Sequence, residues 1–170
     1  MKKKTELKKL AAAALLCALA VVCSPLSIPV GASKCFPVQH LVNVLCGVFL
    51  GPWYGMGAAF VTSLIRNILG TGSLLAFPGS MCGAFLCGFL YQKFKKLPLA
   101  YVGEVVGTGL IGAMLCFPIA TLVMGKEAAL FTYVIPFGIS SLGGTIIAIV
   151  FVTAFKKAGL LDMFERSLNT

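Results

Sequence analysis

Long apolar runs that alternate with short basic segments limit what this chain can fold into more than any other feature. Charged residues make up only 11% of the sequence, whereas ordinary soluble domains carry about 25%. So few charges cannot cover a water-facing surface, and the lipid bilayer is therefore the expected solvent. Because a spanning helix takes about 20 residues, the 170 residues suffice for six spans in one integral membrane domain, residues 1–170.

Hydropathy predicts an all-α membrane protein with six transmembrane helices. The basic head and first apolar run also fit a secretory signal cleaved after Ala20, but the membrane character of the whole chain favours an uncleaved first span. Glycine and proline interrupt several spans, which membrane helices tolerate. The predicted spans are Lys8–Ser27, Pro37–Leu50, Pro52–Leu69, Leu74–Gln92, Leu99–Met124 and Ala128–Phe155.

The basic residues divide unevenly between the two predicted sides of the membrane. If the N-terminus is inside, all of the fourteen Lys and Arg lie on the inner side except Lys34, Arg66 and Lys126. Cytoplasmic loops retain Lys and Arg, so both termini are predicted to be cytoplasmic. The formal net charge of +9 follows from this topology and does not indicate a nucleic-acid partner.

Small residues recur four positions apart along the predicted spans. This spacing lets helix backbones approach closely in lipid, so we expect tight packing within the bundle. The same spacing at Ala14 and Ala18 gives the first span a smooth face that could receive a partner helix. The pairs within the bundle are Gly47/Gly51, Gly79/Gly83, Ala84/Gly88 and Gly103/Gly107.

Polar side chains inside membrane segments are costly and often mark functional sites. Here most of them lie toward the predicted outer ends of the spans, beside aromatic residues. Small-molecule sites share this character, being mostly apolar with a few placed hydrogen-bonding groups. The sequence therefore predicts an outward-facing binding pocket. Its candidate lining residues are Gln39, His40, Asn43, Arg66, Asn67, Phe77, Ser80 and Tyr133.

Three polar residues also have structural interpretations. His40 could bond a loop carbonyl at the membrane interface, and Arg66 could extend to the outer headgroups or cap its helix end. Glu104 lies near the cytoplasmic end of the fifth span, so a direct bridge to Arg66 would need a broken or tilted helix. We expect Glu104 to form a structural hydrogen bond or to lie at the interface as a carboxylate; proton coupling is the functional alternative.

Several motifs that would indicate other functions are absent from the sequence. It holds no GxxxxGK[ST] phosphate loop, no CxxC pair among its seven cysteines and a single histidine, so we predict no metal and no cofactor. Ser80 with His40 is the only pair that an intramembrane serine hydrolase could use, and the flanking sequence does not support it.

Two stretches, PVQHLVNVLCGVFLGPWYG and RNILGTGSLLAFPGSMCGAFLCGFLY, resemble the ThiW family, the thiazole-specific substrate-binding (S) components of energy-coupling factor (ECF) transporters. The resemblance is strongest over Pro37–Tyr91 and continues through VGEVVGTGLIGA and PFGISSLGG. It implies a six-helix S component in the plasma membrane of a prokaryote. Such a protein would not be an enzyme, and would capture a thiamine precursor from outside.

The resemblance also implies a ligand and partners. The ligand would be hydroxyethylthiazole, which could stack on Phe77 or Tyr133 and accept hydrogen bonds from His40 or Asn43; a phosphorylated thiazole would need a strong cation such as Arg66. The partners would be a coupling transmembrane subunit, meeting the face of Ala14 and Ala18, and two cytoplasmic ATPase subunits.

Two other classes of function remain alternatives to an S component. The first is a self-sufficient secondary transporter, in which Glu104 or His40 carries protons and the chain alone drives uptake. The second is an intramembrane enzyme that uses Ser80, His40 or Glu104. The first predicts uptake that depends on a proton gradient, and the second predicts turnover by the purified chain.

Overall fold

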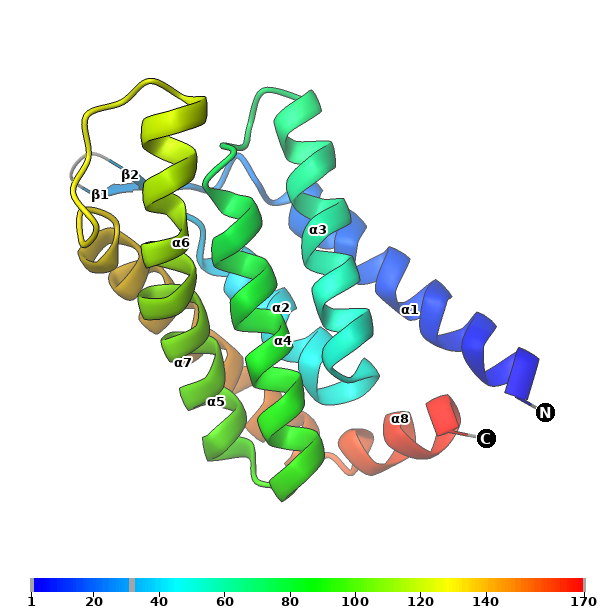
Figure 1. Cartoon of the computed structure of the whole chain (residues 1–170). Coiled ribbons are helices and arrows are strands. Elements are labelled where there is room, and N and C mark those ends of the chain that lie inside the picture. The colour runs from blue at the N-terminus through cyan, green and yellow to red at the C-terminus, as the bar shows by residue number, and fades with distance from the viewer. Residues whose placement is uncertain (1, 31–32, 170) are drawn as a thin grey trace.

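Helices make up nearly all of the protein in the computed structural model, which describes residues 2–30 and 33–169 (Figure 1). One of them is a continuous helical rod from Leu97 to Val123. The rod consists of α5 (Leu97–Val106), η1 (Gly107–Gly112), α6 (Ala113–Pro118) and η2 (Ile119–Val123). The other helices are α1 (Lys2–Val22), α2 (Pro37–Leu50), α3 (Pro52–Ile68), α4 (Ala76–Phe94), α7 (Val134–Lys157) and α8 (Leu160–Asn169).

Proline and glycine set several helix boundaries. Pro37, Pro52 and Pro98 lie in the first turns of α2, α3 and α5, where the missing N–H costs nothing and the fixed φ suits a helix. Gly51 separates α2 from α3 with φ +91°, a backbone conformation that L side chains rarely adopt. The two helices therefore turn back on each other without an intervening loop.

The rod departs from α-helical geometry in two segments. The segments η1 and η2 are π-helical, a form that appears mostly as short insertions in α-helices, often at functional sites. Pro118 directly precedes η2 and lacks the N–H that a regular α-helical turn would use. The first π-helical segment contains three glycines: Gly107 and Gly112 allow the close approach of α4, and Gly109 allows that of α7.

The helices from α2 to α7 form the body of the bundle, with α1 leaning against α3 at one side and α8 lying across one end (Figure 1). Both termini lie toward that same end. A short antiparallel hairpin, β1 (Ile28–Val30) and β2 (Ser33–Cys35), pairs Ile28 with Cys35 and joins α1 to α2. The sequence analysis did not predict this hairpin.

A helix overlies each predicted span, with shifted boundaries at the two ends of the chain. The first helix ends at Val22 rather than Ser27, because Pro25 and the hairpin follow it. The last begins at Val134 rather than Ala128, and residues 128–133 form loop and turns. Two helices, Leu97–Val123 and Val134–Lys157, are long and apolar enough to cross a membrane, and α2 is a shorter apolar helix.

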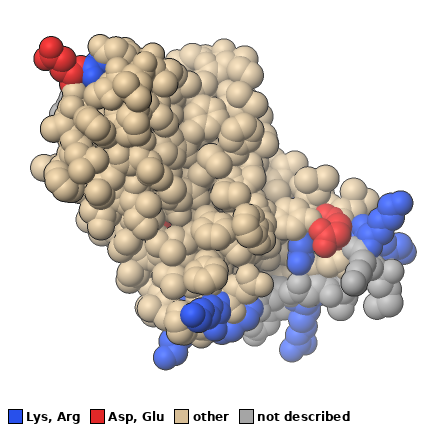
Figure 2. Space-filling model, viewed as in Figure 1, with Lys and Arg blue, Asp and Glu red and all other residues tan. Residues whose placement is uncertain are grey.

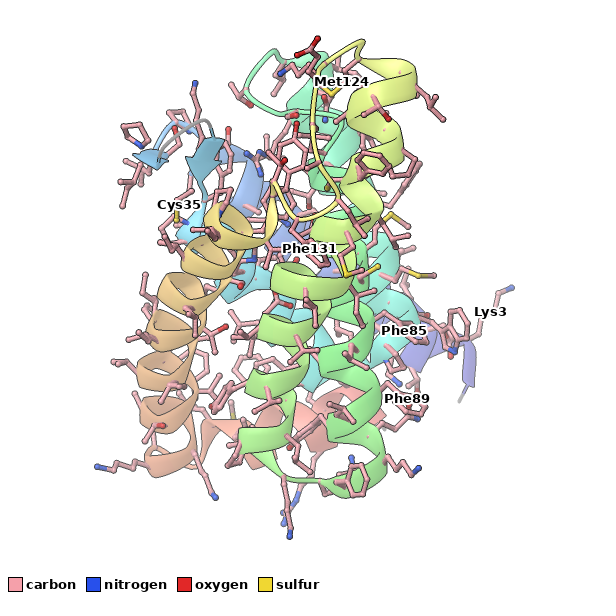
Figure 3. All side chains as sticks on the ribbon, turned by 60° about the vertical axis from the view of Figure 1, so that its left-hand side comes forward. Lys3, Cys35, Phe85, Phe89, Met124 and Phe131 are labelled. Atoms are coloured by element: carbon pink, nitrogen blue, oxygen red, sulfur yellow. The ribbon has the colours of Figure 1, made fainter. Side chains whose placement is uncertain are left out.

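The surface of the bundle suits a lipid environment. Figure 2 shows a broad face without charged side chains, whereas Lys and Arg gather at the end that holds the α4–α5 turn and along the N-terminal helix. Large apolar side chains are exposed on this body, and Phe89 is an example. The partly buried Phe85 lies beside it on one face of α4, with the two ring centroids 6.2 Å apart (Figure 3). We conclude that this is an α-helical membrane protein.

Small residues bring the helices close together, as their spacing predicts. A Cβ atom added at Gly103 would lie 2.9 Å from the Cα of Cys87, and one added at Gly107 would lie 2.6 Å from the carbonyl oxygen of Cys82. One added at Gly88 would lie 2.7 Å from the backbone nitrogen of Pro52. Helix α4 thus packs backbone against backbone with the α2–α3 turn on one side and with the rod on the other.

Candidate functional site

Polar side chains fill the centre of the bundle between α2, α3, α4, the rod and α7. Three of them, Gln39, His40 and Asn43, come from the first two turns of α2 and are all buried. Their spacing of three and four residues places them on neighbouring parts of one helix face. In a bundle whose outer surface is apolar, such a buried cluster must satisfy its own hydrogen bonds.

Glu104 is the centre of this cluster. Its side chain is completely buried, and its Oε1 atom accepts hydrogen bonds from Asn43 Nδ2 at 3.0 Å and Thr108 Oγ1 at 3.1 Å. His40 Nδ1 lies 2.9 Å from the same oxygen. The expectation of an interfacial carboxylate is therefore wrong, and the expected structural hydrogen bond is confirmed. The second carboxylate oxygen, Oε2, has no hydrogen-bond partner among the described residues.

His40 uses both of its ring nitrogens. Its Nε2 atom lies 2.9 Å from Ser140 Oγ, and that hydroxyl oxygen accepts a hydrogen bond from the backbone N–H of Phe36 at 3.0 Å. The Ser140 hydroxyl is then free to donate to Nε2, which assigns the proton of Nδ1 to the bond with Glu104. The alternative interpretation of His40, a bond to a loop carbonyl, is wrong.

A second line of hydrogen bonds runs from the carboxylate to Arg66. Gln39 Nε2 donates to Asn43 Oδ1 at 3.1 Å, and Arg66 Nη1 donates to Gln39 Oε1 at 3.1 Å. Two amides thus connect the guanidinium to Glu104 in place of a direct bridge. Arg66 is only 1% exposed, so the expectation that it extends to the headgroups is wrong.

A cavity of about 70 Å³ borders this cluster. Ligand sites for small molecules are commonly about 300–1,000 Å³, so a ring with a flexible arm can enter only if lining side chains move. Phe137 on α7 and Phe36 before α2 are the aromatic residues of the wall. The remaining lining is Lys34, Gln39, His40, Arg66, Ser73, Leu75, Ala76, Gly79, Ser80, Thr108 and Ser140.

Four of the eight predicted pocket residues line this cavity: Gln39, His40, Arg66 and Ser80. The other four are held elsewhere. Asn43 lies behind the wall, bound to Glu104.

Asn67 donates to the backbone carbonyls of Ser63 and Ser73, and so fixes the loop after α3. The Phe77 ring packs on Phe60, and Tyr133 packs on Phe137.

The proposed serine–histidine pair does not form. Ser80 Oγ donates to the backbone carbonyl of Ala76 and lies 3.2 Å from Ser63 Oγ, while the serine next to His40 is Ser140. The fold therefore does not form the contact that an enzyme using Ser80 with His40 would need.

Glu104, Thr108, Phe36 and Lys34 belong to the site but were not among the predicted lining residues, whereas Ser140 and Phe137 were further candidates from the last span. The cause is depth. Helix α2 has 14 residues, or about 21 Å, so its first turns lie well inside the bundle.

Gly51, at the end of α2, and the α4–α5 turn border a common surface pocket. Counted from that end, Asn43 on α2 and Glu104 on α5 both lie about 10 Å along their helices. The pair Glu104 and Thr108, four apart on a helix in an apolar run, was the available signal.

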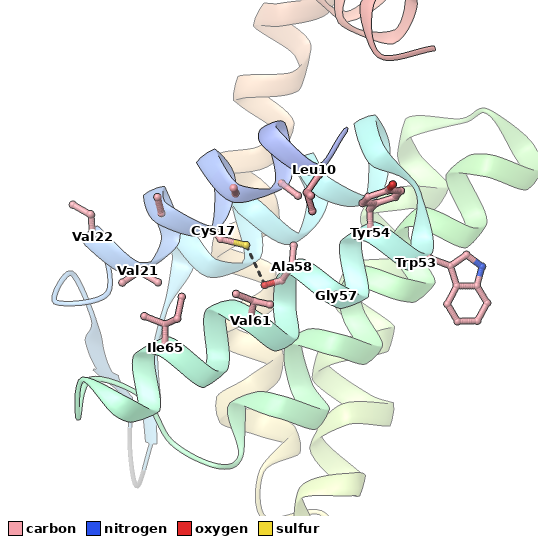
Figure 4. A pocket seen from close by; sticks show the side chains of 13 residues that line it. Leu10, Cys17, Val21, Val22, Trp53, Tyr54, Gly57, Ala58, Val61 and Ile65 are labelled. Carbon is pink, nitrogen blue, oxygen red and sulfur yellow. Dashed lines mark hydrogen bonds between the residues drawn. The ribbon is translucent and has the colours of Figure 1, made fainter. Parts of the chain in front are cut away.

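A second hollow lies on the outside of the bundle. Helices α1 and α3 diverge to form an apolar groove of about 730 Å³, lined by Ala14 and Ala18 among others (Figure 4). Its floor is closed where Cys17 Sγ donates to the carbonyl oxygen of Ala58 at 3.4 Å. The sequence-predicted docking face and this groove therefore coincide.

Titratable side chains do not gather into a further site. In residues 2–30 and 33–169, no group of three or more His, Cys, Asp and Glu side chains is placed to hold a metal ion. The cysteines of this part of the chain are all free.

A family of known proteins matches most of the chain. The family described as thiamine-precursor transporter protein (ThiW) matches residues 10–158, a range that includes the central cluster, the cavity and the groove. No curated protein and no solved structure matches the chain. The matched range takes in nearly the entire helical bundle, so the chain belongs to the ThiW family of thiamine-precursor transporters.

Proposed function

We propose that this chain is the S component of an ECF-type importer, and that it captures hydroxyethylthiazole from outside the cell. In this proposal six helices cross the plasma membrane of a prokaryote, both termini are cytoplasmic, and the chain catalyses no reaction. A coupling transmembrane subunit and two ATPase subunits supply the energy. The observation that carries the proposal is the cavity against the buried polar cluster of α2.

The chemistry of the cavity suits a thiazole. Its aromatic wall can pack on a flat ring, and groups in the wall can exchange hydrogen bonds with a ring nitrogen and a hydroxyl. His40 and Ser140 line the cavity and are held by the fold, so little ordering is needed on binding. Because the Phe137 ring borders the cavity, we propose that it moves to admit the ligand.

Binding to the purified, detergent-solubilised chain tests the ligand assignment. We expect saturable binding of hydroxyethylthiazole, with thiamine and the pyrimidine precursor binding more weakly. His40→Ala should weaken it by about tenfold or more, because a buried hydrogen-bonding group is lost and its partners are left unpaired. The matched control is Cys35→Ala, a buried residue outside the cavity lining. Absence of binding in a folded sample would exclude the ligand assignment.

The groove between α1 and α3 is the proposed docking site for the coupling subunit. Ala14 and Ala18 are exposed there and line an apolar surface, so a partner helix could approach the α1 backbone closely. Ala14→Trp should leave ligand binding by the isolated chain unchanged. It should reduce uptake with the energising subunits by about tenfold or more, since overpacking costs about 1–3 kcal/mol. Leu15→Trp, on the exposed neighbouring face, is the control; equal loss in both variants would exclude this docking face.

A second candidate is a proton-coupled transporter that works alone. The buried contact between His40 and Glu104 favours it, because ionisable groups inside membranes often mark proton pathways. Reconstituted vesicles separate the two candidates. Uptake by the chain alone, driven by an imposed proton gradient and lost in Glu104→Gln, would establish the second candidate; uptake only with the ATPase subunits and ATP would establish the first.

A further inference from the structure

Arg66 is a buried cation that forms no ion pair with any described residue. A guanidinium carries five N–H donors, and within the described part of the chain Arg66 forms two hydrogen bonds. One goes to Gln39 Oε1 at 3.1 Å, and the other goes to the carbonyl oxygen of Thr71 at 3.5 Å. The Nε atom is buried without a partner. Among the described residues, no carboxylate forms an ion pair with Arg66, since Glu104 is engaged by His40.

Such a charge is expensive inside a membrane protein. A buried cation is commonly paired with an anion or with backbone carbonyls. The position of Arg66 in the last turn of α3 offers some compensation from the helix dipole. That dipole does not account for the unused donors, and the contact with Thr71 is longer than a normal hydrogen bond. Among the described residues, the remaining N–H donors of Arg66 thus lack a hydrogen-bond acceptor.

The residues around Arg66 place its unused donors beside the cavity. Arg66 lines it together with Lys34, the second cation of its wall. The Phe36 ring lies 3.9 Å from the guanidinium carbon and covers one face of the group. Stacking on the face leaves the in-plane donors at the edge free for hydrogen bonds, and such a planar edge matches the oxygens of a carboxylate or a phosphate.

We propose that Arg66, aided by Lys34, forms an anion subsite of the cargo cavity. The transported thiamine precursor then carries a phosphate monoester or a carboxylate on the arm of its thiazole ring. The inference rests on the proposed function, and it replaces the neutral alcohol by an anionic form as the preferred ligand. The ring would lie between Phe137 and His40, and the anion would lie against Arg66.

Three ligands with the same ring test the proposal: hydroxyethylthiazole, its phosphate monoester, and 4-methylthiazole-5-acetate. Affinities are measured by calorimetry on the full-length chain in detergent, for the wild type and for Arg66→Gln, Arg66→Lys, Lys34→Gln and Lys126→Gln. Lys126 is an exposed cation outside the cavity, and its variant is the matched control. A separate thermal-unfolding series with inorganic phosphate tests for the anion subsite without a thiazole.

We expect one or both anionic ligands to bind about 10- to 100-fold more tightly than the alcohol, the value of one charge-assisted hydrogen-bonded contact. Which of the two is preferred identifies the anion. Arg66→Gln should abolish the preference, lowering the affinities for the anionic ligands by about tenfold or more beyond any change in the affinity for the alcohol. Arg66→Lys should retain part of the preference, Lys34→Gln should reduce it, and Lys126→Gln should change nothing. If Arg66→Gln does not fold, the lysine variant and Lys34→Gln carry the test.

Equal or tighter binding of the alcohol would overturn the anion subsite and leave the proposed function intact. So would an equal loss of all three affinities in Arg66→Gln, which is the result of a purely structural role. If no thiazole binds but phosphate raises the unfolding temperature of the wild type and not of Arg66→Gln, the subsite stands and the proposed function fails. If phosphate has no effect either, both fail.

Discussion

Replacing Glu104 with alanine is expected to lower the free energy of unfolding by about 3–5 kcal/mol, the range for breaking a buried charged pair, and to abolish ligand binding. The reason is the number of groups that depend on one oxygen atom. Asn43 and Thr108 donate to Oε1 and His40 contacts it, so its removal leaves His40 Nδ1 unpaired in a buried site. Asn43 and Thr108 would keep only their longer hydrogen bonds to the carbonyl oxygens of Ser80 and Gly79. Each unpaired group costs about 1–3 kcal/mol.

Thermal unfolding in detergent and ligand calorimetry measure the two effects of this change. Glu104→Gln should be milder, because it keeps the shape and one acceptor oxygen. Glu127→Ala removes an exposed carboxylate from the loop after the rod and should have little effect. If Glu104→Ala unfolded at the wild-type temperature and bound ligand normally, the central role of this carboxylate would be refuted.

Gly107→Ala should destabilise the bundle by about 2 kcal/mol or more, within the upper range for overpacking. The added Cβ would lie 2.6 Å from the carbonyl oxygen of Cys82 and 2.8 Å from the Cα of Gly83. Both are backbone atoms, so α4 as a whole must move away from the rod. Thr108 would move with it, and its contacts with Glu104 and with the carbonyl oxygen of Gly79 would be disturbed.

Gly143→Ala is the matched control for this substitution. Gly143 lies in α7 and has nothing within 4 Å of its added Cβ, so alanine should be neutral or stabilise the helix by up to about 1 kcal/mol. The unfolding temperatures of both variants in the same detergent give the comparison. If the two variants unfolded at the same temperature, the close approach of α4 and the rod would not restrict the size of the residue at position 107.

Much of the helical arrangement follows from hydropathy and from small residues. The boundaries of α2 agree with the prediction because prolines and Gly51 define them chemically. The start of α7 was placed six residues too early, since the segment before Val134 is apolar and hydropathy does not distinguish an apolar loop from a helix. The hairpin after α1 has strands of three residues. Such strands are too short to show the alternation of apolar and polar residues that predicts a strand.

The candidate site was predictable in composition and less so in arrangement. The residues of α2 and Arg66 were found because polar side chains in apolar runs are rare. Glu104 was placed away from them because span order gives the side of the membrane but not the depth of each helix. Asn67 and Phe77 were misassigned because neighbouring positions on one helix point in different directions, and only the packed bundle shows which direction faces the cavity.

The hydrogen-bonded amides between Arg66 and Glu104 have a single sense. Gln39 and Asn43 both turn their oxygens toward the guanidinium and their NH₂ groups toward the carboxylate. Reversing one amide alone would set oxygen against oxygen or NH₂ against NH₂, and reversing both would set an NH₂ group against the guanidinium and an oxygen against the carboxylate. The charge of Arg66 thus helps to fix the donor that Asn43 presents to Glu104, although no direct bridge joins the two charged groups.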